Sequence, residues 1–139
     1  MNDQDLLAKI VGTGGDPADL PFWTACREGK FMLHQCEQCG TNYWPASRCV
    51  THGDQAMRWV EGSGRGTLYT YTVMHHAYMP EMKDKLPYVV AVVKMKEGPF
   101  FHSNLTCGPE AVRVGMPLQA EMTVHANGMT VPIFRPVEN

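Results

Sequence analysis

The sequence has no long hydrophobic run, and this absence argues against a membrane-spanning protein. Its longest apolar stretch covers residues 88–93, whereas a spanning helix needs about 20 consecutive apolar residues. The first five residues are acidic and lack the basic segment and following apolar segment of an export signal. We therefore expect a cytoplasmic protein with no membrane partner.

The sequence also lacks a surplus of positive charge. It carries 12 Lys and Arg against 14 Asp and Glu, for a net charge of −2, and from Asp54 onward basic and acidic residues are interspersed. Proteins that bind nucleic acid concentrate Lys and Arg on one face to contact phosphates. We therefore expect no nucleic-acid partner.

Cysteines are few, and most of them follow the spacing of metal ligands. Of the five, Cys36, Cys39 and Cys49 form two x2 pairs together with His52. Cys and His are the ligands of tetrahedral Zn²⁺, and a closed four-ligand site is structural rather than catalytic. The spacing predicts a structural zinc site and a reducing compartment rather than a disulfide scaffold. The alternative is a chance cluster in a loop without metal.

Three other residues lie close to this pattern or share its chemistry, but they fall outside it. His34 lies on an alternating strand and does not complete an x2 pair. Cys26 and Cys107 are each expected to be small buried apolar residues. A nucleophilic role for Cys107 is the alternative, although no base partner is identifiable in the sequence.

We expect one ordinary domain, or a small module joined to a larger one, in three segments. Residues 1–30 form an N-terminal helical arm, residues 31–56 a zinc ribbon and residues 57–139 an OB-fold domain. In the arm, residues 5–11 carry apolar positions at helical spacing, and Asp19 is placed to cap a second helix that stops at Gly29. These helices either pack on their own domain or dock on another subunit.

The third segment is predicted to be β throughout, which makes the fold mainly β. Strands are expected at residues 68–74, 88–93, 100–104, 118–125 and 131–134. Asn127-Gly128 is a hairpin turn signal, and Gly64 and Gly66 are suited to a strong bend in the first strand. The pattern favours a small five-stranded barrel, with the OB-fold as the leading candidate.

The segment of residues 75–86 is a candidate contact surface, because loops between barrel strands often bind ligands. Methionines offer an adaptable apolar surface and lysines can meet the phosphates of coenzyme A. The candidate contacts to a partner or to CoA are His75, His76, Met79, Met82, Lys83 and Lys85. Adjacent strand residues point to opposite faces, so we expect one histidine of the pair to be buried. A plain solvated loop is the alternative.

An ordered set of short motifs resembles one known family. The motifs are Pro21-Phe22-Trp23, Cys36-x-x-Cys39-Gly40, Trp44-Pro45, the second metal pair, Gly64-Arg65-Gly66-Thr67-Leu68-Tyr69, Pro87-Tyr88, Gly115-Met116-Pro117 and Phe134-Arg135-Pro136. The family is the zinc-ribbon/OB-fold family first catalogued as domain of unknown function thirty-five. The resemblance implies helices, a rubredoxin-like zinc ribbon and a five-stranded OB-fold barrel. One departure is His52, because the family's fourth ligand is usually Cys.

The resemblance also implies a working context. Members are typically small subunits of thiolase-superfamily enzymes or of hydratases that act on acyl-CoA thioesters, and the thiolase subunit carries the catalytic residues. We expect a non-catalytic, zinc-binding partner in a hetero-oligomer. It would support thiolytic cleavage of a bulky, aromatic or steroid-derived β-oxoacyl-CoA. The alternative is a stand-alone OB-fold protein that binds nucleic acid or acyl-CoA.

Overall fold

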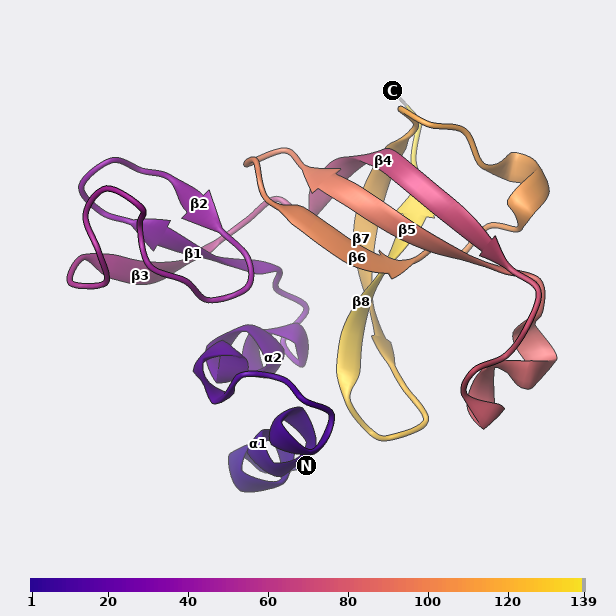
Figure 1. The fold of residues 1–139 in the computed structure, drawn as a ribbon, viewed down its shortest axis with the longest axis horizontal. Helices are drawn as coiled ribbons and strands as arrows, with labels where there is room; N and C mark the ends of the chain where they lie inside the picture. The colour runs from indigo at the N-terminus through magenta and orange to yellow at the C-terminus, as the bar shows by residue number, and fades with distance from the viewer. Residues whose placement is uncertain (139) are drawn as a thin grey trace.

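The computed structural model describes residues 1–138, which form a helical pair, a three-stranded ribbon and a five-stranded barrel (Figure 1). The helical pair comprises α1 (Asp3–Gly12), a 3-10 turn η1 (Pro17–Asp19) and α2 (Leu20–Cys26). No helix within residues 1–138 combines the length and the apolar character needed to cross a membrane.

The helices begin and end partly where the sequence places them. Asn2 caps α1, because its side chain accepts the Asp5 N–H at 2.8 Å. The expectation for Asp19 is wrong: it precedes α2, but its side chain makes no cap hydrogen bond there and instead accepts the Ala46 N–H. The helix ends at Cys26, and Gly29 lies in the following turn with a φ of 78°.

The ribbon is an antiparallel sheet in the order β2-β1-β3. Its strands are β1 (Met32–Cys36), β2 (Asn42–Tyr43) and β3 (Met57–Glu61). Residues 57–61 are predicted from the sequence to belong to the barrel segment, yet β3 pairs along its whole length with β1. The ribbon sheet therefore extends beyond residue 56, and the division of the chain into three domains stays a prediction.

The barrel contains five antiparallel strands in the order β6-β5-β4-β7-β8. The strands are β4 (Arg65–Met74), β5 (Tyr88–Met95), β6 (Phe100–Asn104), β7 (Pro117–Val124) and β8 (Thr130–Pro136). A parallel bridge between Leu105 and Phe134 nearly closes the sheet, as the Thr106 N–H donates to the Phe134 carbonyl at 2.9 Å. The mainly β class and the OB-type barrel are confirmed.

Glycines at the start of β4 allow the barrel to close tightly. Gly64 has a φ of 71°, a left-handed conformation that side chains rarely adopt. A Cβ at Gly66 would lie 2.6 Å from the Lys94 carbonyl oxygen. Both positions therefore require glycine, one for its backbone angle and the other for the close approach of β5.

An aromatic cluster joins the helices, ribbon and barrel into one core. Phe22 of α2 is fully buried, and its ring centroid lies 3.9 Å from that of Trp44, 5.3 Å from Phe31 and 5.8 Å from Phe101. The second helix thus packs on its own chain, which was one of the two alternatives for the arm.

The first helix is held by the long β7–β8 hairpin, which reaches down beside it (Figure 1). Leu6 and Ile10 are buried together with Met129, next to the hairpin turn. The predicted turn at Asn127-Gly128 is confirmed, because the Gly128 N–H donates to the His125 carbonyl and Gly128 has a φ of 88°. Met129, directly after the hairpin turn, thus forms part of the surface on which α1 packs, together with Leu20 and Trp23 of α2.

Candidate functional site

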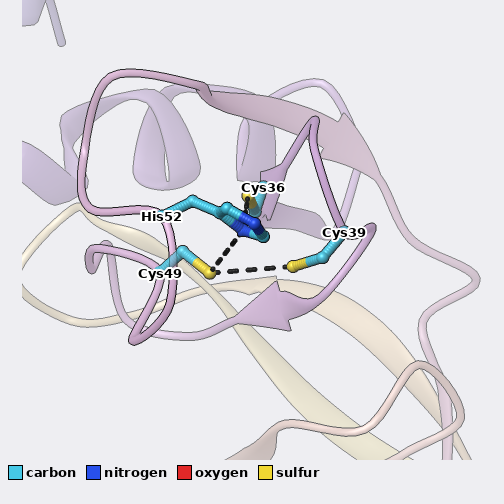
Figure 2. Close-up of side chains that lie close together, drawn as sticks. All are labelled: Cys36, Cys39, Cys49 and His52. Carbon is cyan, nitrogen blue, oxygen red and sulfur yellow. Dashed lines mark hydrogen bonds between the residues drawn. The ribbon is translucent and has the colours of Figure 1, made fainter.

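The four predicted metal ligands converge from the two loops of the ribbon (Figure 2). Cys36 ends β1, Cys39 lies in the turn that leads to β2, and Cys49 and His52 lie between β2 and β3. Gly40, with a φ of 74°, allows the first turn to fold back, and its N–H donates to the Cys36 carbonyl at 2.8 Å. The ribbon thus brings together all four residues that the sequence nominates.

The distances within the cluster fit a tetrahedral metal. Zn–S bonds of about 2.3 Å and Zn–N bonds of about 2.0–2.1 Å, at tetrahedral angles, imply S···S separations of about 3.8 Å and S···N separations of about 3.6 Å. The Cys39 and Cys49 sulfurs are 3.6 Å apart. His52 Nδ1 lies 3.6 Å from the Cys36 sulfur and 3.5 Å from the Cys49 sulfur. The donor set can therefore close around one ion.

Hydrogen bonds to the sulfurs favour the thiolate form that binds metal. The Thr51 backbone, followed by the His52 backbone and the Tyr43 hydroxyl, lowers the pKa of Cys49 to about 5. The Thr41 hydroxyl, 3.2 Å from the Cys39 sulfur, lowers the pKa of that thiol. The ribbon thus holds at least two of its sulfurs ready as anionic ligands.

The other nearby candidates take structural positions, as the sequence indicates. His34 lies against Trp59, with ring centroids 4.6 Å apart, and its Nδ1 accepts the Ser47 N–H at 3.2 Å. Cys26 is buried in the aromatic core, and burial raises the pKa of its thiol to about 12. Neither residue belongs to the metal cluster.

The predicted contact segment, residues 75–86, divides over two sides of the short turn η2 (Pro80–Lys85). His76 and Lys83 line a shallow groove with Tyr78, whose ring centroid is 4.8 Å from that of His76. Met82 is buried instead and faces a different cavity together with Lys85. Lys83 and Lys85 thus line separate surfaces.

The other predicted contact residues of this segment are solvent-exposed. Both His75 and His76 are exposed, so the expectation that one of them is buried is wrong. The reason is that β4 ends at Met74, before the pair, so strand alternation does not apply to it. Met79 is also exposed, at 50%. The segment offers an apolar and basic surface, and its role as a contact stays a prediction.

A cavity of about 510 Å³ lies between η2, the end of β6 and the β7–β8 pair. The sequence nominates only part of its lining, namely Met82, Lys85 and Cys107. Other lining residues, among them Tyr88, Asn104 and His125, come from positions far apart along the chain. No local sequence signal connects these positions, because the barrel's pairing alone brings them together.

Cys107 is half-buried on the wall of this cavity, and its surroundings do not activate it. Burial, with the negative charge of Glu110 as a further cause, raises the pKa of its thiol. Within residues 1–138, no hydrogen bond joins it to a histidine or another base. A nucleophilic cysteine needs the opposite conditions, a lowered pKa or an adjacent base. The raised pKa of Cys107 is therefore the reverse of what a nucleophilic thiol requires.

Comparison with known proteins adds a family context to this geometry. Residues 59–123 match the family model described as ChsH2, C-terminal OB-fold domain. The chain is 30% identical over 114 residues to a DUF35 domain-containing scaffold protein of Methanocaldococcus jannaschii, which covers 76% of this chain and 80% of that protein.

Two further matches link the chain to named enzymes. It is 33% identical over 121 residues to a probable enoyl-CoA hydratase alpha subunit of Thermomonospora curvata, covering 85% of this chain. It spans only 37% of that longer relative. Among solved structures, a chain described as Ltp2-ChsH2(DUF35) aldolase superposes with a TM-score of 0.78 at 29% identity, covering 87% of this chain and 95% of that one.

Proposed function

This chain belongs to the DUF35 family, and from that membership we propose that it is a non-catalytic partner subunit of a larger enzyme acting on acyl-CoA thioesters. The observation that carries the proposal is its likeness to the ChsH2(DUF35) aldolase chain, which extends over nearly all of both chains. The similarity to a hydratase alpha subunit supports the same class of assembly.

The chemistry of the described residues agrees with a supporting role. A thiolase needs a nucleophilic cysteine of low pKa with acid/base partners. Cys36, Cys39 and Cys49 are engaged in the metal cluster, Cys26 is sealed in the core, and Cys107 has a raised pKa. The bond-breaking step therefore belongs to a partner subunit.

We assign the partner to the thiolase type, and the reaction to thiolytic cleavage of a β-oxoacyl-CoA. In that reaction a thiolate attacks the β-carbonyl carbon, the bond between the α and β carbons breaks, and the α carbon takes up a proton. The resulting acyl group is then transferred to the thiol of coenzyme A. A bulky aromatic or steroid-derived acyl group is the substrate that we propose within this class.

Zinc is the metal that we assign to the cluster of Cys36, Cys39, Cys49 and His52, because three thiolates and one imidazole form one of its closed structural sites. When bound there, zinc would cross-link the two ribbon loops, and its four protein ligands would leave no coordination position open. The ribbon is too small to bury a sufficient core of its own. The metal therefore fixes a rigid element beside the barrel, suited to hold a partner.

Co-expression of this chain with thiolases from the same genome tests the function. We expect the chain to copurify with one such thiolase, and thiolysis of β-oxoacyl-CoA to require both chains. Cys36→Ser should abolish assembly and activity together, whereas Cys107→Ser should retain both. Assembly with an aldolase or hydratase instead would disprove the thiolase assignment but keep the subunit role. Thiolytic activity of the isolated chain would contradict a non-catalytic subunit.

The alternative, an independent OB-fold binder of nucleic acid, predicts a different result. It requires tight, salt-sensitive binding of single-stranded DNA by the purified chain. We expect no such binding, because the chain carries a net charge of −2. Binding of an oligonucleotide at physiological salt would replace the proposal with this alternative.

A further inference from the structure

Three basic side chains gather at the end of the barrel where β4 begins and β5 ends. Arg65, Lys94 and Lys96 are all exposed and line one groove of about 340 Å³. They are brought together by pairing, because the Lys96 N–H donates to the Arg65 carbonyl at 2.8 Å. Basic residues that are scattered along the sequence thus form a local positive cluster. The i, i+2 spacing of Lys94 and Lys96 already indicates that these two side chains share one face of a strand.

Within residues 1–138, no carboxylate forms an ion pair with any of these three side chains. The nearest acidic residue along the chain, Glu97, binds the backbone instead, because its Oε2 accepts the Ser63 N–H at 2.7 Å. The groove floor between the cations is apolar and includes Met95 and Leu118. The groove therefore offers free positive charge at its rim and an apolar surface inside.

An exposed aromatic pair lies on the outer face of the same strands. Lys94 is paired across the sheet with Thr67 on one side and Phe100 on the other, so these side chains share the outer face. The Tyr69 ring centroid lies 4.9 Å from that of Phe100, and the two residues are 58% and 44% exposed. Large aromatic side chains this exposed are suited to stacking on a planar ligand.

We propose that this end of the barrel binds a nucleotide-type small molecule, with its phosphates on Arg65, Lys94 and Lys96 and its base against Tyr69 and Phe100. Cations bind phosphate through charge-assisted hydrogen bonds, and aromatic rings stack on bases. The identity of the natural ligand rests on the proposed function: it is the phosphorylated adenosine end of the CoA thioester. It lies apart from the lysines of residues 75–86.

The extent of the basic cluster favours a small molecule over a nucleic-acid strand. Proteins that hold single strands place cations along the path of the backbone. Here the remaining outer-face positions of β5 and β6 are Tyr88, Val90, Val92, His102 and Asn104, and none is Lys or Arg. Along β5 and β6, the positive charge of the outer face is therefore confined to Lys94, which is paired with Phe100.

Calorimetric titration of the purified full-length chain tests the site with coenzyme A, adenosine 3′,5′-bisphosphate and phosphate-free pantetheine. We expect the first two to bind with salt-sensitive affinity and pantetheine not to bind. The double variant K94A/K96A should weaken binding of both phosphorylated probes by about tenfold or more. Tyr69→Ala should weaken binding of the bisphosphate but not of inorganic pyrophosphate, which has no base.

A matched control removes the same charge elsewhere: K30A/R113A alters two exposed basic residues that do not line the groove and should bind like the wild type. An equal loss of affinity in this control would show that net charge alone explains the effect, and would contradict the proposed site. A loss of affinity seen only in K83A/K85A would place the ligand at residues 75–86 instead and contradict the proposed site. Tighter binding of a thymidine oligomer than of coenzyme A would also contradict the proposal. All these outcomes are independent of assembly with a thiolase.

Discussion

The Asp19 carboxylate accepts a hydrogen bond from the Ala46 backbone N–H at 2.7 Å. This contact joins the start of α2 to the ribbon loop just after Trp44, beside the aromatic core. Asp19 is only 7% exposed, and it is the one buried charged residue within residues 1–138. A side chain suited to capping a helix thus ties two separate segments together.

Substitutions at Asp19 should separate the hydrogen bond from the charge. Asp19→Ala leaves the Ala46 N–H without its partner, and should lower the free energy of unfolding by about 1–3 kcal/mol. Asp19→Asn keeps an acceptor oxygen of the same shape and should cost less. Urea unfolding of the three proteins at neutral pH measures the difference; equal losses in both variants would contradict the role assigned to the hydrogen bond.

The same pair predicts a pH dependence. Burial raises the pKa of Asp19 above its ordinary value of 3.8, while the Ala46 hydrogen bond opposes the shift. The folded state therefore holds the proton more tightly than the unfolded chain. This stabilising contribution is present at low pH and lost as the pH rises through the folded-state pKa. The free energy of unfolding of the wild type, measured relative to that of Asp19→Asn, should be highest in acid and decrease towards neutral pH. An increase towards neutral pH would show that the pKa of Asp19 is lowered instead.

The metal cluster predicts a link between zinc content and folding. The wild type should hold about one equivalent of zinc by elemental analysis, because four ligands close one site. Cys36→Ser should lose both the zinc and the folded ribbon, since metal binding supplies about 10 kcal/mol or more in comparable peptides. A strong chelator should have the same effect on the wild type, followed by circular dichroism.

Two variants serve as controls for that experiment. Cys107→Ser changes a cysteine outside the cluster and should keep the full zinc content. His52→Cys supplies a fourth thiolate, which zinc also accepts, and should keep the metal as well. A wild type that is folded and free of metal would rule out the structural role of zinc.

The parts of the fold that local patterns encode could be predicted from the sequence. Alternation located the barrel strands, Asn127-Gly128 marked the hairpin, and the x2 pairs identified the cluster that the structure assembles. The partner of β3 could not be predicted, because its register against β1 depends on pairing between distant segments. The alternation of Lys94 and Lys96 was a local signal for the basic cluster, but the position of Arg65 beside them depends in the same way on pairing between distant segments. Such features follow from tertiary packing, which one-dimensional spacing does not contain.

The aromatic core predicts that the helical arm is integral to the fold. Phe22 is fully buried against four other aromatic side chains, so Phe22→Ala should lower the free energy of unfolding by about 3–5 kcal/mol. Val11→Ala is the matched control, because Val11 lies on α1 and is 53% exposed; its effect should stay within about 0.5 kcal/mol. Thermal unfolding compares the two. A small effect at Phe22 would mean that α2 is dispensable for the core.

The close approach of β4 and β5 predicts opposite effects at two glycines. A Cβ at Gly66 would meet the Lys94 carbonyl oxygen at 2.6 Å and Val93 Cγ1 at 2.7 Å. The backbone atom cannot move without disturbing the β4–β5 pairing, so Gly66→Ala should cost about 1–3 kcal/mol. Gly12, at the end of α1, has no atom within 4 Å of an added Cβ. Gly12→Ala should therefore be neutral or stabilise by up to about 1 kcal/mol. Chemical denaturation of both variants provides the comparison, and a neutral Gly66→Ala would show that the strands can separate at this point without loss of the barrel.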